Sequence, residues 1–215
     1  RSGATGQIRT KKTKLSVRFV RPQRRIFENR PMRVIAGQYR GRSLKSPADT
    51  RTRPTSDRLR ETLFNVIAPR IDEATRFLDL CAGTGAIGIE SLSRGAAFTT
   101  FVDISRRACA LIEDNLDHLG VPEDETEIVC LTAETFAARQ HAAGWDIVYF
   151  DPPYDIDYST VLYEFGADYS KLLNADGLLI VEHHAKAQMP DAVGLLRRWR
   201  ILKQGDSSLS FYERN

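Results

Sequence analysis

Residues 77–88 read Phe-Leu-Asp-Leu-Cys-Ala-Gly-Thr-Gly-Ala-Ile-Gly, a short apolar run followed by a glycine-rich loop. Apolar residues then continue at helical spacing through Ile87, Ile89 and Leu92. A strand, a glycine loop and a helix in this order form a cradle for a negative ligand group at the helix N-terminus. The stretch therefore predicts one unit of an open α/β sheet that binds its ligand at the carboxyl end of the strand.

Strands and helices continue to alternate along the chain after this unit. The further predicted strands are residues 98–102, 127–131, 147–150 and 177–182. The further predicted helices begin at Ser105, which caps a helix closed by Gly120, and at Ala133. Residues 200–203 and 209–212 predict a final hairpin. The alternation is typical of a doubly wound parallel sheet, so we expect an α/β, Rossmann-like fold with a C-terminal antiparallel hairpin.

The N-terminal region carries different signals. Residues 33–37 and 42–45 flank a Gln-Tyr-Arg-Gly turn and predict a small β-hairpin. A helix is expected to open around Pro54, with Ser56 as its cap, and to end at Pro69. We therefore expect three parts, namely a basic extension (1–31), an N-terminal hairpin and helix lobe (32–70) and the α/β domain (71–215).

Two acidic residues around the glycine loop indicate the kind of ligand. The second predicted strand ends in Asp103, a carboxylate placed to accept both ribose hydroxyls of a nucleoside. The glycines also fit G-x-G-x-x-G, and Asp103 lies 20 residues after Gly83, so NAD fits the same pattern. Asp79, four residues before Gly83, would face a cationic amino group and not a pyrophosphate. This favours S-adenosylmethionine, with Gly83 and Gly85 allowing close backbone approach.

Residues 146–154 read Asp-Ile-Val-Tyr-Phe-Asp-Pro-Pro-Tyr, an apolar strand that ends in a clamp for a planar NH2 group. Asp151 accepts one N–H and the Pro152 carbonyl accepts the other, because neither Pro152 nor Pro153 brings a competing donor and both fix φ. Tyr154 stacks on the flat base that carries the amine. The clamp resembles the Asp/Asn-Pro-Pro-Tyr/Phe motif of amino-group methyltransferases. The alternative interpretation is a strand that ends in a simple Pro-Pro turn.

The charge of the chain is distributed unevenly. The net charge is +3, but residues 1–60 hold 18 Lys and Arg against 3 Asp and Glu, whereas residues 61–215 hold 13 against 25. A basic lobe beside a base-clamping site predicts a polyanionic substrate, because phosphate neutralisation supplies most of the affinity for nucleic acids. A solvated charged tail remains the alternative for residues 1–31.

Composition excludes several other classes of protein. No apolar run approaches the length of a membrane span, and no signal-peptide core is present, so we expect no membrane partner. Three cysteines without a C-x-x-C pair fit a reducing compartment, which predicts the cytoplasm. The four histidines show no metal-site spacing, and the adjacent His183 and His184 are expected to be structural, so we expect no metal.

These features together resemble the RsmD family of bacterial 16S rRNA guanine-N2 methyltransferases. The resemblance runs from Met32 to the C-terminus and is carried by Met32–Arg42, Arg53–Asn65, Leu78–Ala96 and Asp151–Tyr154. The family usually has Glu at the position of Asp103, and the shorter acid is still expected to reach a ribose. Residues 1–31 have no counterpart in the family.

The resemblance implies a Rossmann-like methyltransferase domain that uses S-adenosylmethionine to methylate a guanine of 16S rRNA, in an assembled or assembling small subunit. The implied catalytic residues are Asp151, Pro152, Pro153 and Tyr154. The expected cofactor-binding residues are Asp79, Ala82, Gly83, Gly85, Asp103, Ile104, Ala133 and Glu134. The expected RNA-binding residues are Arg33, Arg40, Arg42, Lys45, Arg51, Arg53 and Arg58. The hairpin arginines among them have fewer acids nearby in sequence and are expected to be freer to meet phosphates, whereas Arg53 and Arg58 are expected to pair with acids of the α/β domain more readily.

Two other functions stay open. A DNA adenine-N6 methyltransferase shares the clamp motif, although that class usually carries a sizeable target-recognition domain, which this sequence lacks. A catalytically idle RNA-binding assembly factor would keep the fold, but the intact glycine loop and clamp disfavour it. We expect a monomer.

Overall fold

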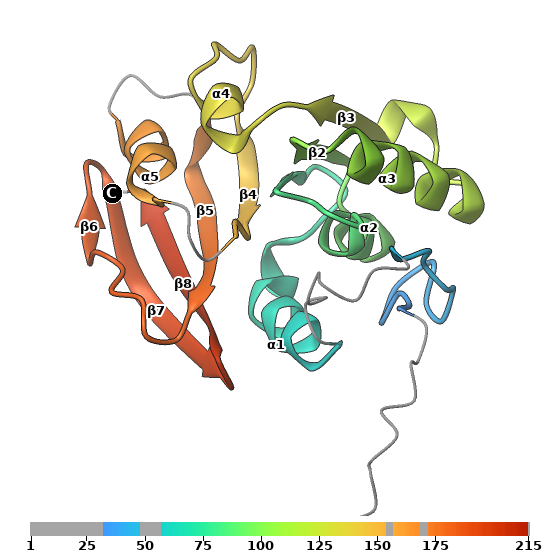
Figure 1. Ribbon diagram of the computed structural model, residues 1–215, viewed down its shortest axis with the longest axis horizontal. Helices are drawn as coiled ribbons and strands as arrows, with labels where there is room; N and C mark the ends of the chain where they lie inside the picture. Colours follow the sequence, from blue (N-terminus) through green and yellow to red (C-terminus); the bar gives the residue numbers. More distant parts are fainter. Residues whose placement is uncertain (1–31, 48–56, 154–156, 168–171, 215) are drawn as a thin grey trace, which may run out of the picture. The chain divides into compact units, whose positions relative to one another are not determined.

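The computed structural model describes residues 32–47, 57–153, 157–167 and 172–214 (Figure 1). Contacts divide the chain into two units, Arg1–Arg30 and Pro31–Asn215, and every described residue belongs to the second unit. The predictions made for residues 1–31, for the helix cap at Ser56, and for Arg51, Arg53 and Tyr154 fall outside the described residues.

Within these ranges the chain alternates between helices and strands, as predicted. The helices are α1 (Asp57–Ile67), η1 (Ala68–Arg70), α2 (Ala86–Ser93), α3 (Arg106–Leu119), η2 (Glu123–Glu125), α4 (Ala133–Ala137) and α5 (Ser159–Gly166). The strands are β1 (Arg76–Leu80), β2 (Phe98–Asp103), β3 (Thr126–Cys130), β4 (Trp145–Phe150), β5 (Leu173–His184), β6 (Ala192–Val193), β7 (Leu196–Gln204) and β8 (Ser207–Arg214). The short elements α5 and β6 were not predicted, and β5, β7 and β8 extend beyond their predicted ranges.

One eight-stranded sheet organises the described residues, in the order β3-β2-β1-β4-β5-β8-β7-β6. The five strands from β3 to β5 are parallel, whereas β8, β7 and β6 are antiparallel. This confirms the doubly wound sheet and the C-terminal antiparallel hairpin. The chain leaves β1 toward β2 and later returns on its other side as β4, so the topological switch point lies between β1 and β4.

Helices cover both faces of the sheet because strand side chains alternate between them. On one face, α4 and α5 pack on Leu78 and Leu80 of β1. On the other face, α1 packs on Phe77 of the same strand. Residues of α2 and α3 form a third cluster with Val34, Tyr39 and Leu44. The N-terminal residues 32–47 therefore share their core with two helices of the sheet domain.

The predicted N-terminal hairpin is smaller than expected. Its only ladder contact among the described residues is an isolated antiparallel bridge between Arg33 and Ser43. One reason is that Glu90 of α2 accepts hydrogen bonds from Ile35 N–H and Ala36 N–H, which belong to the first predicted strand. The turn is held on the same helix. Gln38 N–H donates to the Ser93 carbonyl at 2.7 Å. Gly37 lies so close to α2 that a Cβ there would be 1.6 Å from the same carbonyl oxygen.

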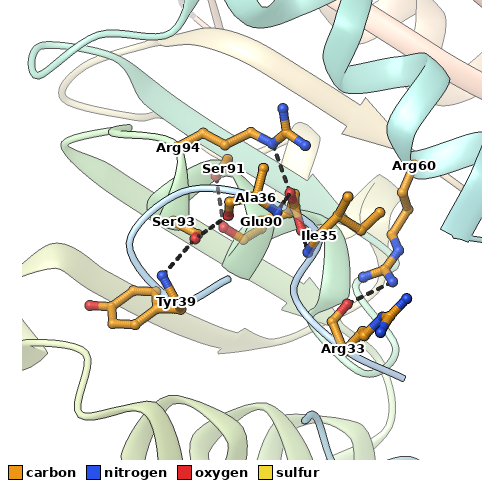
Figure 2. A network of polar contacts seen from close by, with 10 residues as sticks. Arg33, Ile35, Ala36, Tyr39, Arg60, Glu90, Ser91, Ser93 and Arg94 are labelled. Atoms are coloured by element: carbon orange, nitrogen blue, oxygen red, sulfur yellow. Dashed lines mark hydrogen bonds and ion pairs between the residues drawn. The ribbon is translucent and has the colours of Figure 1, made fainter. Parts of the chain in front are cut away.

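Glu90 is the main anchor of this N-terminal segment on α2 (Figure 2). Its side chain is fully buried, and its two carboxylate oxygens accept hydrogen bonds from Ile35 N–H at 2.7 Å and Ala36 N–H at 3.0 Å. Arg94, one turn later on α2, donates from Nε to the same carboxylate at 2.7 Å. The carboxylate thus satisfies two backbone donors and one cation away from water, where an unpaired group is costly.

We expect Glu90→Ala to lower the free energy of unfolding by about 3 kcal/mol or more, because it leaves two buried N–H groups and Arg94 without their acceptor. Urea denaturation with a tryptophan fluorescence readout measures the change. Glu113→Ala, at an exposed position of α3, is the matched control and should lie within about 0.5 kcal/mol of wild type. A Glu90→Ala variant as stable as the control would contradict the anchoring role.

Candidate functional site

The predicted site residues come together at the carboxyl ends of β1, β2 and β4. Leu80, the last residue of β1, pairs in register with Val102 on one side and with Phe150 on the other. The loops that follow are joined by backbone hydrogen bonds, from Ala82 N–H to the Val102 carbonyl at 3.0 Å and from Asp151 N–H to the Leu80 carbonyl at 3.3 Å. The glycine loop therefore has the Asp103 end on one flank and the Pro-Pro loop on the other.

Asp103 holds the glycine loop in place. Its carboxylate accepts hydrogen bonds from Gly83 N–H at 2.9 Å and from Ser105 N–H at 2.8 Å. Gly83 has a φ of 56°, and a Cβ built on it would meet nothing within 4 Å, so the space above the loop is open. Cys81 has a φ of 65°, which is unusual for a residue with a side chain. Such backbone strain is typical of ligand-binding loops.

Asp79 lies beneath the same loop and is almost completely buried. One carboxylate oxygen accepts a hydrogen bond from Gly88 N–H, in the first turn of α2, at 2.9 Å. The pKa of Asp79 is raised from 3.8 to about 7, chiefly by burial and to a lesser extent by the nearby charge of Asp103, while the hydrogen bond from Gly88 lowers it. A cation brought to this carboxylate would therefore favour its ionised form.

The flank beyond Asp103 offers an apolar surface. Ile104 is 69% exposed, which is unusual for so large an apolar side chain. In the next strand Cys130 pairs in register with Asp103, and its Sγ lies 3.6 Å from the Ile104 carbonyl oxygen. Ala133 is buried and Glu134 is half-buried at the start of α4, whose first turn is capped by Thr132. A flat heterocycle is the kind of group that this exposed apolar side chain fits.

On the other flank, β4 carries a buried polar contact two residues before the Pro-Pro loop begins. Pro152 is buried, Asp151 is half-buried and Pro153 is exposed. The Tyr149 hydroxyl donates a hydrogen bond to the buried carboxylate of Glu182 on β5. Burial raises the pKa of Tyr149, and the charges of Asp151 and Glu182 add to this, so the phenol stays protonated and keeps donating. Glu182 was not predicted as a supporting residue of the site.

Asn115 is a second supporting residue that the motifs did not reveal. Its side chain is fully buried on α3, and Nδ2 donates to the carbonyls of Thr84 and Lys45, both at 3.1 Å. Its Oδ1 accepts from Lys45 N–H at 2.7 Å. Asn115 thus ties the glycine loop to the N-terminal segment. The available signal was a polar residue on the helix face shared by Ile112 and Leu116.

The predicted basic surface is only partly free. Arg33, Arg40 and Arg58 have exposed side chains. In contrast, Lys45 forms an ion pair with Asp114 of α3, with Nζ 3.1 Å from the carboxylate, and Arg42 Nη2 donates to the His118 carbonyl at 2.5 Å. Lys45 therefore has an acidic partner that the sequence did not indicate. Sequence distance did not reveal the partner because α3 comes close only in the fold.

The described residues contain no group of three or more His, Cys, Asp or Glu side chains that could hold a metal ion. His183, which was expected to be structural, is buried, and its Nε2 is 2.9 Å from Ser210 Oγ. Across the helices of these residues, none combines the length and apolar character that a membrane span requires.

Comparisons with known proteins agree with this architecture. The model of the family described as "Conserved hypothetical protein 95" matches residues 32–213. "Putative rRNA methyltransferase YlbH" of Bacillus subtilis is 36% identical over 185 residues, which cover 85% of this chain and 99% of that protein. "Ribosomal RNA small subunit methyltransferase D" of Escherichia coli K12 is 42% identical over 123 residues, 57% of this chain and 60% of the relative. The solved structure of "Putative methyltransferase yhhF" from Escherichia coli has a TM-score of 0.73 at 33% identity and covers 86% of this chain and 98% of its own.

The raised pKa of Asp79 gives a testable dependence of stability on pH. The folded protein keeps a proton on Asp79 up to about pH 7, whereas the unfolded chain releases it near pH 4. The stabilisation is therefore fully present below about pH 4 and is lost as the pH rises through 7. The side chain of Asp79→Asn stays neutral at every pH. The free energy of unfolding of this variant relative to wild type should therefore increase as the pH rises across this window and then level off. Urea denaturation at several pH values measures the difference, and a difference that stays constant with pH would contradict the raised pKa.

Proposed function

This chain belongs to the family described as "Conserved hypothetical protein 95", and we propose that it transfers the methyl group of S-adenosylmethionine to the exocyclic N2 amine of a guanine in small-subunit ribosomal RNA. The observation that carries the proposal is the junction at Leu80. There, the glycine loop follows β1 and the Asp-Pro-Pro loop follows the neighbouring parallel strand β4, so the two loops lie side by side. The relatives named as ribosomal RNA methyltransferases support the choice of substrate.

The residues of the glycine loop and its flank fit S-adenosylmethionine. Asp79 supplies a buried carboxylate for the cationic amino group, and the open backbone at Gly83 admits the amino acid part. Asp103 accepts from the ribose hydroxyls, while exposed Ile104 covers one face of the adenine. Ala82, Gly85, Ala133 and Glu134 complete the expected lining. When bound, the cofactor supplies a methyl group on a positively charged sulfur.

The Pro-Pro loop prepares the amine for attack. Asp151 and the Pro152 carbonyl accept the two N–H groups of guanine N2, which aims the nitrogen at the methyl group and stabilises the positive charge that develops on it. Tyr154 stacks on the guanine, whose removal from its own stack costs a few kcal/mol. Proton loss after transfer needs no strong base, so Asp151 acts as an acceptor that positions the amine.

The proposed setting is the cytoplasm, with a monomeric enzyme acting on 16S rRNA in an assembled or assembling small subunit. Incubation with labelled S-adenosylmethionine and naked 16S rRNA, small subunits or DNA, followed by identification of the modified base, tests this directly. Label in N2-methylguanine of ribosomal RNA is the expected result. Label in N6-methyladenine of DNA would establish the alternative methyltransferase, and cofactor binding without any transfer would favour the idle assembly factor.

Asp103→Ala should raise the Kd for S-adenosylmethionine by about 10-fold or more, because it removes a charge-assisted hydrogen bond of about 1.5–3 kcal/mol. Calorimetry measures the affinity. Asp103→Glu, which restores the residue usual in the RsmD family, should stay within a few-fold of wild type. Asp124→Ala, at an exposed position of η2, serves as the control. Binding of NAD without binding of S-adenosylmethionine would refute the cofactor assignment.

Asp151→Ala should abolish turnover while the Kd for S-adenosylmethionine stays within a few-fold, since its bonds are made to the base being methylated. Asp151→Asn keeps an acceptor oxygen and should retain much of the rate. Tyr154→Ala should impair substrate positioning far more than Tyr154→Phe, because stacking needs the ring and not the hydroxyl. Single-turnover kinetics separate these cases, and a near-normal rate for Asp151→Ala would show that the clamp mechanism is wrong.

A further inference from the structure

The C-terminal strands extend past the Pro-Pro loop. Phe150, at the end of β4, pairs in register with Val181 of β5, but β5 continues to His184. The hairpin of β7 and β8 extends equally far, because His184 pairs with Ser207 and Ser207 pairs with Gln204. Three further residues at about 3.3 Å each carry these strands roughly 10 Å beyond the end of β4. Figure 1 shows β5, β7 and β8 running side by side past the end of β4.

Strand β7 is basic along its length. Its sequence, Leu-Arg-Arg-Trp-Arg-Ile-Leu-Lys-Gln, contains four cations and no acid. Arg197 and Arg198 are engaged locally, Arg197 with the Gly194 carbonyl and Arg198 with Asp191. Within the described part of the chain, neither Arg200 nor Lys203 forms an ion pair, and both side chains are exposed.

Register places Lys203 at the same level of the sheet as the Pro-Pro loop. Lys203 pairs with Ser208 of β8, and Ser208 pairs with His183 of β5. His183 lies two residues beyond Val181, and Pro152 lies two residues beyond Phe150, the register partner of Val181. Adjacent strands are about 4.8 Å apart, so Lys203 lies roughly 14 Å across the sheet from the row of Pro152. Burial lowers the pKa of His183, and the charges of Arg198, His184 and, least of all, Lys203 add to this.

An exposed aromatic side chain accompanies these cations. Trp199 is 47% exposed and sits where the register of β7 against β8 shifts, at a β-bulge between Arg198 and Arg200. Its ring packs against Phe211 at a centroid distance of 5.7 Å, and the Arg200 guanidinium lies 5.9 Å from its centre. Bulges re-aim side chains and are common near functional sites. An indole that packs on Phe211 and is still 47% exposed offers ring surface on which a base can stack.

We infer that β7 is a second RNA-binding surface, on which Arg200 and Lys203 contact phosphates and Trp199 stacks on a base in the single-stranded segment flanking the target guanine. The inference rests on the proposed function. Arg200 pairs with Phe211, and Lys203 pairs with Ser208. Because successive side chains of a strand alternate between its faces and Phe211 and Ser208 are an odd number of positions apart, the two cations lie on opposite faces of the strand. They therefore flank its outer edge, where a backbone that follows the strand meets both.

The competing explanation is protection of a sheet edge. β6 pairs only with Leu196 and Arg197, so the outer edge of the remainder of β7 has no partner strand among the described residues. Lysine and arginine often protect such edges from pairing with other chains. Protection explains the charges, but it gives no reason for an exposed indole, which adds apolar surface at that edge.

The two tryptophans allow a direct test of stacking. Trp145 is 3% exposed, so a ligand that touches the surface changes mainly the emission of Trp199. Titration of the full chain with a short single-stranded RNA should quench its fluorescence, and Trp199→Phe should remove most of the quenching while preserving the packing on Phe211. Quenching that is equal in wild type and Trp199→Phe would overturn the stacking role.

The cations are tested by salt dependence. Arg200→Gln and Lys203→Gln should each reduce the magnitude of the negative slope of log K against log salt by about 0.7, the value for one phosphate contact on a single strand. The KM for the RNA substrate should rise several-fold, with kcat and the Kd for S-adenosylmethionine unchanged. Arg139→Gln, which removes one exposed cation from the loop after α4, is the matched control and should leave the slope unchanged.

The outcomes separate this inference from the proposed function. Ribosomal RNA methylation by wild type, with unchanged KM and salt slope in both variants, would overturn the β7 surface and leave the enzyme assignment intact. Failure of wild type to methylate any RNA would refute the proposed function by itself. A change of oligomeric state in the variants, seen by light scattering, would instead assign the edge to pairing between copies of the chain and would also overturn the RNA-binding surface.

Discussion

The parallel pairing of β1 with β2 on one side and β4 on the other is the constraint on which the site depends. Because all three strands end at the same edge, the loops that follow them meet there, although Gly83 and Asp151 are far apart in sequence. The backbone bonds of Ala82 and Asp151 to strand ends then fix the two loops relative to each other. Methyl transfer requires this fixed separation, since donor and acceptor must be aligned to react.

Carboxylates that accept backbone hydrogen bonds supply the remaining rigidity, and two of them, Asp79 and Glu90, are buried. Asp103 accepts from the glycine loop, Asp79 accepts from the first turn of α2, and Glu90 accepts from the N-terminal segment. Each satisfies backbone N–H groups that regular secondary structure leaves unpaired, which is the condition for burying them. Two of these acids are also the proposed cofactor ligands. Their hydrogen bonds to the backbone fix their geometry before any ligand arrives, which reduces the ordering cost of binding.

The sequence was sufficient for the sheet and for the motif residues, because strands, caps and glycine loops leave local signals. Asp103 ends one apolar run, Asp151 follows another, and Asp79 lies next to the last residue of β1; parallel topology brings such positions together. The parts that were missed depend on contacts distant in sequence. Glu182 supports Tyr149 from the neighbouring strand, and Lys45 meets Asp114 across 69 positions. The size of the N-terminal hairpin was misjudged for the same reason, since Glu90 takes the donors that a ladder would use.

The order of the strands also bears on how a large RNA reaches the clamp. Residues 32–47 pack with α2 and α3, which belong to the β1 and β2 side of the switch point, whereas β7 lies beyond β5 on the other side. The Asp-Pro-Pro loop after β4 falls between these two regions. In the proposed complex, the cations of these two regions position the phosphates, while Asp151 and the Pro152 carbonyl select the base by its amine.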